Sequence, residues 1–319
     1  MAGLLSGALT AAPAAARTAP RPAAPVSMRT LSIGGNPDKV MIGPSGVWVG
    51  DAAELERVDP MTEAVASVPG ATTPIALGTD LVFAGVYTRP GTLGSVDPTT
   101  LRVGSTYMLG GTTAGAAVDA SSLWVLDASG ILTRLDPATG AVTGTVGLGS
   151  FGFALTVGAG SVWVSGRTTD PNAGPLGSLH TMHTDAVVWR VDPSTLAVVA
   201  TIPTAANCDA LAGNGDAIWA ACGTARRVDP AHNRIVGTKA VALNGIAVAD
   251  GTAWALSETG VVTRLDAASG RTLSAIAVPP GSEGIAAGDG ALWISNPHLH
   301  DHQTKLGTGT LLRIDDMSG

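Results

Sequence analysis

The sequence predicts an all-β fold: a seven-bladed β-propeller that is closed by its N-terminal strand. An aromatic residue in a strand of the type G-x-x-W-V recurs seven times, and an R-x-D-P-like turn follows each aromatic. From residue 28 to the end, the chain divides into seven units of about 42 residues, the spacing of four-stranded propeller blades. One such unit exposes two faces and two edges, so it must stack on its neighbours.

The markers of the repeat have structural interpretations. We interpret the aromatic as a wedge between blades, and the Asp-Pro-x-Thr-Gly pattern as a type I turn in which Asp accepts a backbone N–H and Gly leaves the turn. An Arg two residues before the Asp shares its face of the strand, where the two can pair. The aromatics are Trp48, Phe83, Trp124, Trp163, Trp219, Trp254 and Trp293. The aspartates are Asp59, Asp97, Asp136, Asp192, Asp229, Asp266 and Asp315.

A small, apolar strand precedes each aromatic and suits the innermost position beside the crowded axis. The last unit stops after Arg313-Ile314-Asp315, where its outer strand should begin. Met28–Ile33 resembles that missing strand, so we expect residues 30–33 to pair with residues 311–314 and to remove the free edges of the ring. The expected inner strands are residues 39–42, 74–77, 114–118, 153–157, 209–211, 245–248 and 284–287.

The start of the chain differs from the repeats, so we expect a leader over residues 1–27 and one propeller domain over residues 28–319. Met1–Pro25 contains an apolar run and an Ala-Pro-Ala-Ala-Ala segment that resemble the hydrophobic and cleavage regions of a secretory signal, without a basic first region. The alternative is a disordered Ala/Pro leader. We predict a secreted or cell-envelope protein without a membrane span, because no other segment reaches about 18 apolar residues.

The composition excludes one class of partner, and the spacing of the two cysteines predicts a disulfide. A net charge of −7 and an aromatic content of 4% exclude nucleic acid, which needs a basic surface and stacking side chains. Cys208 and Cys222 flank a hairpin centred on Gly215, so they face each other and predict a disulfide, which persists in oxidising compartments. Two reduced buried thiols are the alternative. The spacing lacks the second pair of a zinc site. We expect a monomer.

The repeat pattern is G-x-x-W-V, then R-x-D-P-x-T-G, then a short Val/Ile strand. This pattern is similar to that of the YncE-type seven-bladed propellers and, more distantly, to that of the streptogramin (virginiamycin B) lyase group. The resemblance covers Met28 to Gly319 and implies the propeller fold. Lyase-like repeats carry Glu three residues after the Trp, and this chain has none there. Its residues at those positions are Asp51, Val86, Asp127, Gly166, Cys222, Ser257 and Asn296.

Two long loops after the aromatic strands, residues 166–185 and 295–308, are candidate functional insertions on the rigid ring. They carry five of the six histidines: His180, His183, His298, His300 and His302. In an extended segment the last three share one face, a ligand set suited to a divalent transition metal, with Glu283 as a further ligand or general base. The alternative is that these are solvated histidines without a metal, so no cofactor is certain.

The loops that enter the inner strands lie on the same face of the ring, around the channel mouth. Their polar residues can bind a polar ligand or an extended peptide. We therefore predict an exported binding module for a protein or small polar ligand, with His180 and His183 among its binding residues. The alternative is a metal-assisted lyase or hydrolase of the streptogramin-lyase-like type with Glu283 as the catalytic group. The expected mouth residues are Asp38, Thr73, Thr113, Phe151, Asp209 and Asn244.

Overall fold

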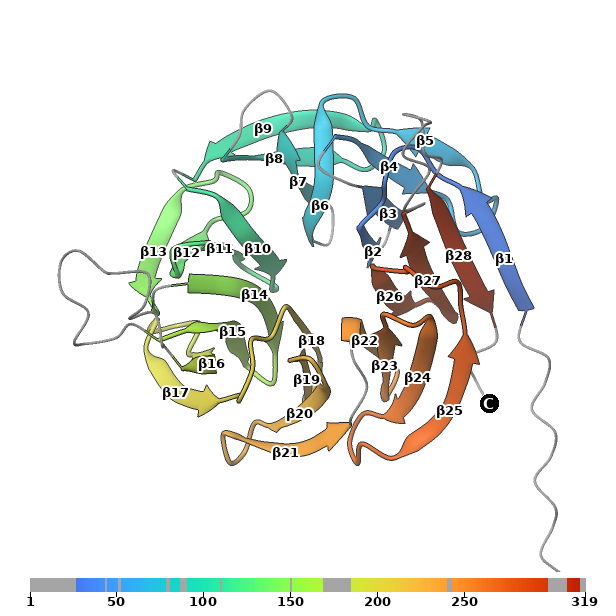
Figure 1. Cartoon of the computed structure of the whole chain (residues 1–319). Helices are drawn as coiled ribbons and strands as arrows, with labels where there is room; N and C mark the ends of the chain where they lie inside the picture. Colours follow the sequence, from blue (N-terminus) through green and yellow to red (C-terminus); the bar gives the residue numbers. More distant parts are fainter. Residues whose placement is uncertain are drawn as a thin grey trace, which may run out of the picture.

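The computed structural model describes ten stretches of the chain, which form 28 strands in seven four-stranded antiparallel sheets and contain no helix. The sheets follow one another around a ring (Figure 1). This arrangement confirms the predicted seven-bladed propeller. The described residues are 27–43, 45–50, 53–78, 81–86, 91–109, 111–149, 151–168, 185–239, 243–297 and 309–315.

Each blade runs from an inner strand outward. The inner strands are β2 (Lys39–Gly43), β6 (Ala71–Leu77), β10 (Thr113–Val118), β14 (Phe151–Gly158), β18 (Ala210–Asn214), β22 (Leu243–Ala249) and β26 (Ile285–Gly288). The aromatic strands are β3 (Gly46–Gly50), β7 (Val82–Val86), β11 (Leu123–Asp127), β15 (Ser161–Arg167), β19 (Ala217–Ala221), β23 (Thr252–Ser257) and β27 (Ala291–Asn296). We number the blades 1 to 7 in this order.

The third strands carry the Arg and Asp of the repeat. They are β4 (Leu55–Val58), β8 (Thr92–Asp97), β12 (Ile131–Leu135), β16 (Ala186–Val191), β20 (Ala225–Asp229), β24 (Val261–Asp266) and β28 (Thr310–Asp315). The outer strands are β5 (Val65–Ser67), β9 (Arg102–Met108), β13 (Val142–Gly147), β17 (Val198–Pro203), β21 (Arg234–Lys239), β25 (Thr272–Ala277) and, in blade 7, β1 (Ser27–Ser32).

The two ends of the chain share blade 7. β1 pairs antiparallel with β28, with Leu31 opposite Leu311, and the two strands lie side by side in Figure 1. Arg29 in β1 also forms ion pairs at 2.6 Å with Asp315 of β28 and at 2.7 Å with Glu63 of blade 1. The predicted closure is confirmed, and ionic contacts tie the closing strand to both blades that it joins.

The aromatic residues of the repeat lie between adjacent sheets, where all seven are at most 3% exposed. Trp254 of blade 6, for example, belongs to one buried cluster with Leu292 and Ile294 of blade 7. A large ring buries 150–250 Å² of surface, roughly, and fills the wedge that opens between two splayed sheets. The hydrophobic core is therefore a series of blade-to-blade interfaces.

The aspartate turns form as predicted. Asp59 accepts hydrogen bonds from the backbone N–H groups of Met61 and Thr62 at 2.8 and 2.9 Å, and the bond from Thr62 does most to hold the pKa of Asp59 below its usual range. Among the six turns that the structure describes in full, the predicted glycine at the turn exit is present in two, as Gly140 and Gly270. Elsewhere other residues adopt the left-handed conformation at this place, namely Glu63, Leu101, Leu196 and Asn233.

The expected pairing of Arg with the Asp two residues later is largely wrong. Among the described residues, such ion pairs are Arg57–Asp59 at 3.9 Å and Arg313–Asp315 at 2.7 Å. In four blades the guanidinium lies over the Trp ring of the neighbouring strand, 5.2 to 5.9 Å from its centroid. In the described part of the chain, Arg313 makes both contacts, whereas Arg134 and Arg190 contact the ring without such an ion pair. The cation is attracted to the face of the ring and points toward the next blade.

The same arginines join consecutive blades. Four of them donate a hydrogen bond to the backbone carbonyl that follows the turn aspartate of the next blade. The donor–acceptor pairs are Arg57–Pro98, Arg134–Pro193, Arg190–Pro230 and Arg313–Pro60. At two other junctions a different donor reaches the equivalent carbonyl: Tyr107 bonds to Pro137 at 3.3 Å, and Trp219 bonds to Ala267 at 3.1 Å. The acceptor position recurs, whereas the donor varies.

Replacing Arg190 by Ala is expected to destabilise the propeller by about 2–3 kcal/mol, because the variant loses a charged hydrogen bond and a cation–π contact. Arg190 bonds to Pro230 at 2.6 Å and lies 5.2 Å from the Trp163 centroid. Urea unfolding measures the change. Arg234→Ala is the matched control: its side chain is 67% exposed and 3.9 Å from Asp229, so the loss there is at most about 0.5 kcal/mol. An equal decrease in the free energy of unfolding in both variants would contradict a stabilising role of Arg190 between the blades.

Candidate functional site

The starts of the inner strands line a single cavity of about 290 Å³, which we call the mouth. Six of the seven blades contribute an equivalent three-residue segment to its wall. These segments are residues 38–40, 114–116, 153–155, 209–211, 244–246 and 283–285. The first residues of the segments are Asp38, Ala114, Phe153, Asp209, Asn244 and Glu283. The structure thus brings four of the residues singled out in the sequence, Asp38, Asp209, Asn244 and Glu283, onto one cavity.

Polarity divides the mouth into two arcs. Four consecutive blades, 5, 6, 7 and 1, supply Asp209, Asn244, Glu283 and Asp38. Blades 3 and 4 supply Ala114 and Phe153 on the opposite side. The remaining wall residues are mostly small or aliphatic, and Lys39, next to Asp38, is the one cationic residue among the described residues that line the cavity. A polar arc with three carboxylates and one ammonium group therefore faces an apolar arc across the axis. This arrangement suits a ligand that has both a charged and an apolar part.

Glu283 and Asp38 come from adjacent blades and influence each other. Burial, and next the negative charge of Asp38, raise the pKa of Glu283. The backbone of Glu283 is held by a hydrogen bond from its N–H to the carbonyl of Ser295 at 3.0 Å, and that of Asp38 by a bond to Gly50 at 3.2 Å. The charge of Asp38 disfavours the ionised form of Glu283, and a cation beside both carboxylates would be attracted to them.

Close approach of the inner strands depends on glycine at the second position of a segment. A Cβ on Gly284 would lie 2.9 Å from the carbonyl oxygen of Asp38, and one on Gly245 would lie 3.1 Å from that of Glu283. The first distance is shorter than real Cβ contacts show, and the second is tighter than nearly all of them, so the glycines let neighbouring blades meet beside the axis. The polar arc is compact for this reason.

Two mouth residues expected from the sequence are misplaced by one or two positions. The lining residues are Ala114 and Phe153, and not Thr113 and Phe151; Thr73 does not line the described cavity either. The pairing register of β10 with β11, and of β14 with β15, shifts between residues 113 and 115 and between residues 152 and 154. Each shift is a β-bulge, which inserts an extra residue and changes the direction of the side chains that follow.

The bulge also occurs in β22, where the register shifts around Asn244. Sequence reasoning missed these bulges because a period-two pattern assumes regular pairing. One signal was available: in blades 3, 6 and 7 the mouth residue directly precedes a glycine, in Ala114-Gly115, Asn244-Gly245 and Glu283-Gly284. Aligning the blades on that glycine selects Ala114 instead of Thr113. In blade 4 the residue after the mouth residue Phe153 is Ala154 and not glycine, so this sequence signal does not identify Phe153.

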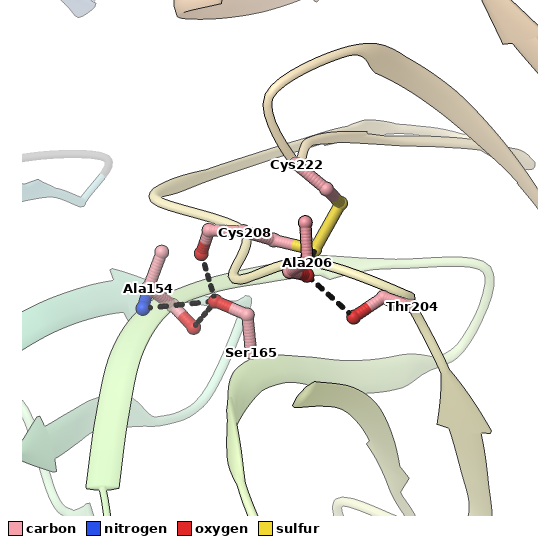
Figure 2. Close-up of a disulfide and its surroundings, with 6 residues drawn as sticks. All are labelled: Ala154, Ser165, Thr204, Ala206, Cys208 and Cys222. Atoms are coloured by element: carbon pink, nitrogen blue, oxygen red, sulfur yellow. Dashed lines mark hydrogen bonds between the residues drawn. A yellow bond between two sulfur atoms is a disulfide. The ribbon is translucent and has the colours of Figure 1, made fainter. Parts of the chain in front are cut away.

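A disulfide joins Cys208 to Cys222 beside the mouth (Figure 2). Both cysteines are 1% exposed. Cys208 directly precedes Asp209, whose N–H donates to the carbonyl of Ala221 at 3.0 Å. Because Ala221 directly precedes Cys222, the covalent link and the hydrogen bond act side by side on the backbone that leads into Asp209. The disulfide therefore fixes the place where blade 5 enters the mouth.

Ser165 connects blade 4 to blade 5, and Figure 2 shows its hydrogen bonds to Ala154 and Cys208. Its hydroxyl donates to the carbonyl of Cys208 at 2.7 Å and accepts from the N–H of Ala154 at 3.1 Å. The side chain is fully buried. Ala154 follows Phe153 in blade 4, and Cys208 precedes Asp209 in blade 5. One buried hydroxyl thus sets the distance between Ala154 and Cys208, and so helps to position the adjacent mouth residues Phe153 and Asp209.

The predicted metal ligands cannot be placed at this site. His180, His183, His298, His300 and His302 lie outside the described residues. Within the described part of the chain, no group of three or more His, Cys, Asp or Glu side chains could hold a metal ion. Asp38, Asp209 and Glu283 of the mouth therefore do not form such a group.

Comparisons with known proteins support the architecture. No protein-family model matches the chain, and no curated protein matches it. Solved structures do match. BamB from Moraxella catarrhalis is 16% identical over 91% of this chain and 84% of its own, with a TM-score of 0.58. The WD40 repeats of RRP9 are 9% identical over 90% of this chain and 97% of their own, with a TM-score of 0.70.

U3-55K is similar at 10% identity over 90% of this chain and 98% of its own, with a TM-score of 0.70. The chain is a seven-bladed β-propeller. At these identities, the shared property is the fold of this propeller, and its function must be argued from the site. The described residues contain no helix long and apolar enough to cross a membrane.

Proposed function

We propose that this propeller is an exported binding module whose mouth holds a small polar ligand that carries a cationic group. The observation that carries the proposal is that Asp38, Asp209 and Glu283 converge with Asn244 on one cavity. The three carboxylates outnumber Lys39, the one cationic residue among the described lining residues, so the cavity has a net negative charge that attracts cations, and the net charge of −7 adds to the attraction. We also propose that the chain is related to the YncE-type propellers, because its repeat pattern is similar to theirs.

The size of the mouth limits the ligand. About 290 Å³ is at the lower end of small-molecule sites. The cavity therefore accepts a small amine, or the side chain of a Lys or Arg presented by a protein partner. Asn244 donates from its amide nitrogen to the carbonyl of Ser282 at 3.0 Å, which orients the amide beside Glu283. Such fixed polar groups provide specificity.

Export is supported by two features. The signal-like segment at the start of the sequence is typical of secreted proteins. The disulfide between Cys208 and Cys222 is a bond that persists in oxidising compartments and is rare in the cytosol. Fractionation of cells that express the full chain tests this part of the proposal.

Titration calorimetry with n-butylammonium at low salt tests the binding proposal. We expect binding by the native chain and an affinity about 10-fold lower in Asp209→Asn, because the variant loses one attractive charge in a partly enclosed site. Asp216→Asn is the matched control: it changes the charge equally at an exposed residue in the turn at the far end of the β18–β19 hairpin. Equal affinities of the two variants would refute the mouth as the site.

The affinity should also depend on pH. Because the pKa of Glu283 is raised, this carboxylate becomes protonated at a higher pH than an ordinary Glu as the pH falls. Cation binding should therefore weaken as the pH falls through that raised pKa. Glu283→Gln should remove this part of the pH dependence and leave the remainder unchanged.

Glu283 also favours a second candidate, the metal-assisted lyase or hydrolase. A carboxyl with a raised pKa in a cavity suits a general base, and a bound divalent cation would polarise a carbonyl or ester oxygen. The described residues offer Glu283 and no complete ligand set, so we assign no step. Equilibrium dialysis against zinc separates the candidates: stoichiometric zinc that is lost in His298→Ala would favour the enzyme.

A further inference from the structure

We infer that Phe153 determines the specificity of the mouth and selects an organic cation that carries an apolar or aromatic group. This inference rests on the proposed function and names the chemical class of its ligand. The charged part of the ligand faces Asp38 and Glu283, and its apolar part packs on the ring of Phe153.

The position of Phe153 carries the inference. It is the one aromatic residue among the described residues that line the mouth. Blade 4, which supplies Phe153, is three blades away from both blade 1 and blade 7 around the ring (Figure 1). Phe153 therefore lies across the cavity from Asp38 and Glu283. A ligand that reaches from one side to the other meets a carboxylate pair at one end and an aromatic ring at the other.

The backbone holds Phe153 in this position by a β-bulge. Gly152 pairs with Gly166 and Ala154 pairs with Ser165, so Phe153 is the extra, unpaired residue. The buried hydroxyl of Ser165 holds Ala154 at 3.1 Å. A Cβ on Gly152 would lie 2.8 Å from the carbonyl oxygen of Asp127, so this position admits no side chain. The bulge presents a half-buried aromatic ring at a place where the equivalent residue of every other lining blade is polar or Ala.

The chemistry of the two arcs selects the ligand class. A Phe ring gains free energy from apolar or aromatic groups that pack on it, and this gain adds to that from the buried area. A small, fully hydrated cation has nothing to pack on the ring and gains from the carboxylates alone. An apolar molecule without charge gains from the ring alone. The mouth therefore favours a molecule that combines both parts.

Titration calorimetry with two probes of equal charge, methylammonium and benzylammonium, tests the inference on the full chain. The native protein should bind benzylammonium about 10-fold more tightly than methylammonium. In Phe153→Ala the two affinities should agree within about 2-fold, with that for methylammonium unchanged. Phe153→Leu should keep part of the preference, because an aliphatic side chain still packs on the probe.

Phe151→Ala is the matched control. Phe151 lies two residues earlier in β14, pairs regularly with Arg167 before the bulge, and is 37% exposed. The same truncation there should leave both affinities unchanged. Thermal melts of both variants check the fold, and Phe153→Leu replaces Phe153→Ala if the latter does not fold.

The outcomes separate this inference from the proposed function. If Phe153→Ala keeps the preference for benzylammonium while Asp209→Asn weakens both probes, the inference is wrong and the mouth remains the cation site. If Phe151→Ala removes the preference, the wrong residue has been assigned. If the native protein binds neither probe, the proposed function and the inference are both wrong.

Discussion

A chain that begins at Gly34, and so lacks the closing strand β1, is expected to lose cooperative folding. Its β28 would expose a row of unpaired backbone groups, and an unclosed ring exposes the interface between blades 7 and 1. Trp293 and Leu311 of blade 7, which pack in one cluster with residues of blade 1, are now buried. The expected loss is comparable to the whole stability of a domain, about 5–15 kcal/mol. Urea unfolding followed by tryptophan fluorescence should show a broad transition or aggregation.

Two controls identify the cause of that loss. Arg29→Ala keeps β1 and removes its ion pairs with Glu63 and Asp315. Because Arg29 is 47% exposed and solvent screens its charge, this change should leave the unfolding transition sharp and lower its midpoint only slightly. A synthetic peptide of residues 27–33, added to the truncated chain, should restore a sharp transition by pairing with β28. A truncated chain that unfolds as sharply as the native one, at the same midpoint, would contradict the role of the closing strand.

Removing the disulfide should have the next largest effect. The bond between Cys208 and Cys222 closes a chain segment with a sequence separation of 14. A cross-link over a loop of this length stabilises a protein by about 3 kcal/mol, because it restricts the unfolded chain. Cys208→Ala/Cys222→Ala should therefore lower the free energy of unfolding by about that amount, measured by urea unfolding under oxidising conditions.

Reducing agent supplies the control for this prediction. Dithiothreitol should shift the unfolding midpoint of the native protein toward that of the double alanine variant and leave the midpoint of the variant unchanged. Since both sulfur atoms are buried, reduction of the folded protein should be slow and should proceed through opening of blade 5. A double variant as stable as the oxidised native protein would show that the cross-link adds nothing.

The number of blades and the closing strand could be predicted from the sequence because their signals are local and repeated. Seven Trp or Phe strands and seven Asp turns give independent estimates of one period. Met28–Ile33 could be paired with the last blade because it was the one outer strand left over. Asp38, Asp209, Asn244 and Glu283 could be placed at the mouth because each lies within two residues of the start of an inner strand, and the topology brings those starts together.

Other features depend on contacts between blades that a local pattern does not contain. The period-two rule placed Arg190 beside Asp192, whereas the guanidinium lies over Trp163 and bonds to Pro230 of the next blade. Its partner is 40 residues away in sequence. The attraction of the ring face and the carbonyl outweighs a solvent-exposed ion pair, which contributes little.

The sequence by itself determined the architecture: all-β, seven units, closed by the first strand. It also placed Asp38, Asp209, Asn244 and Glu283 at the mouth, because the starts of the inner strands meet at one end of the axis. Thr73 and Thr113, which it placed there too, do not line the cavity. Only the tertiary structure decided that Phe153, and not Phe151, completes the cavity. A bulge is set by how β14 packs against β15 and by the hydroxyl of Ser165, and these are contacts between strands.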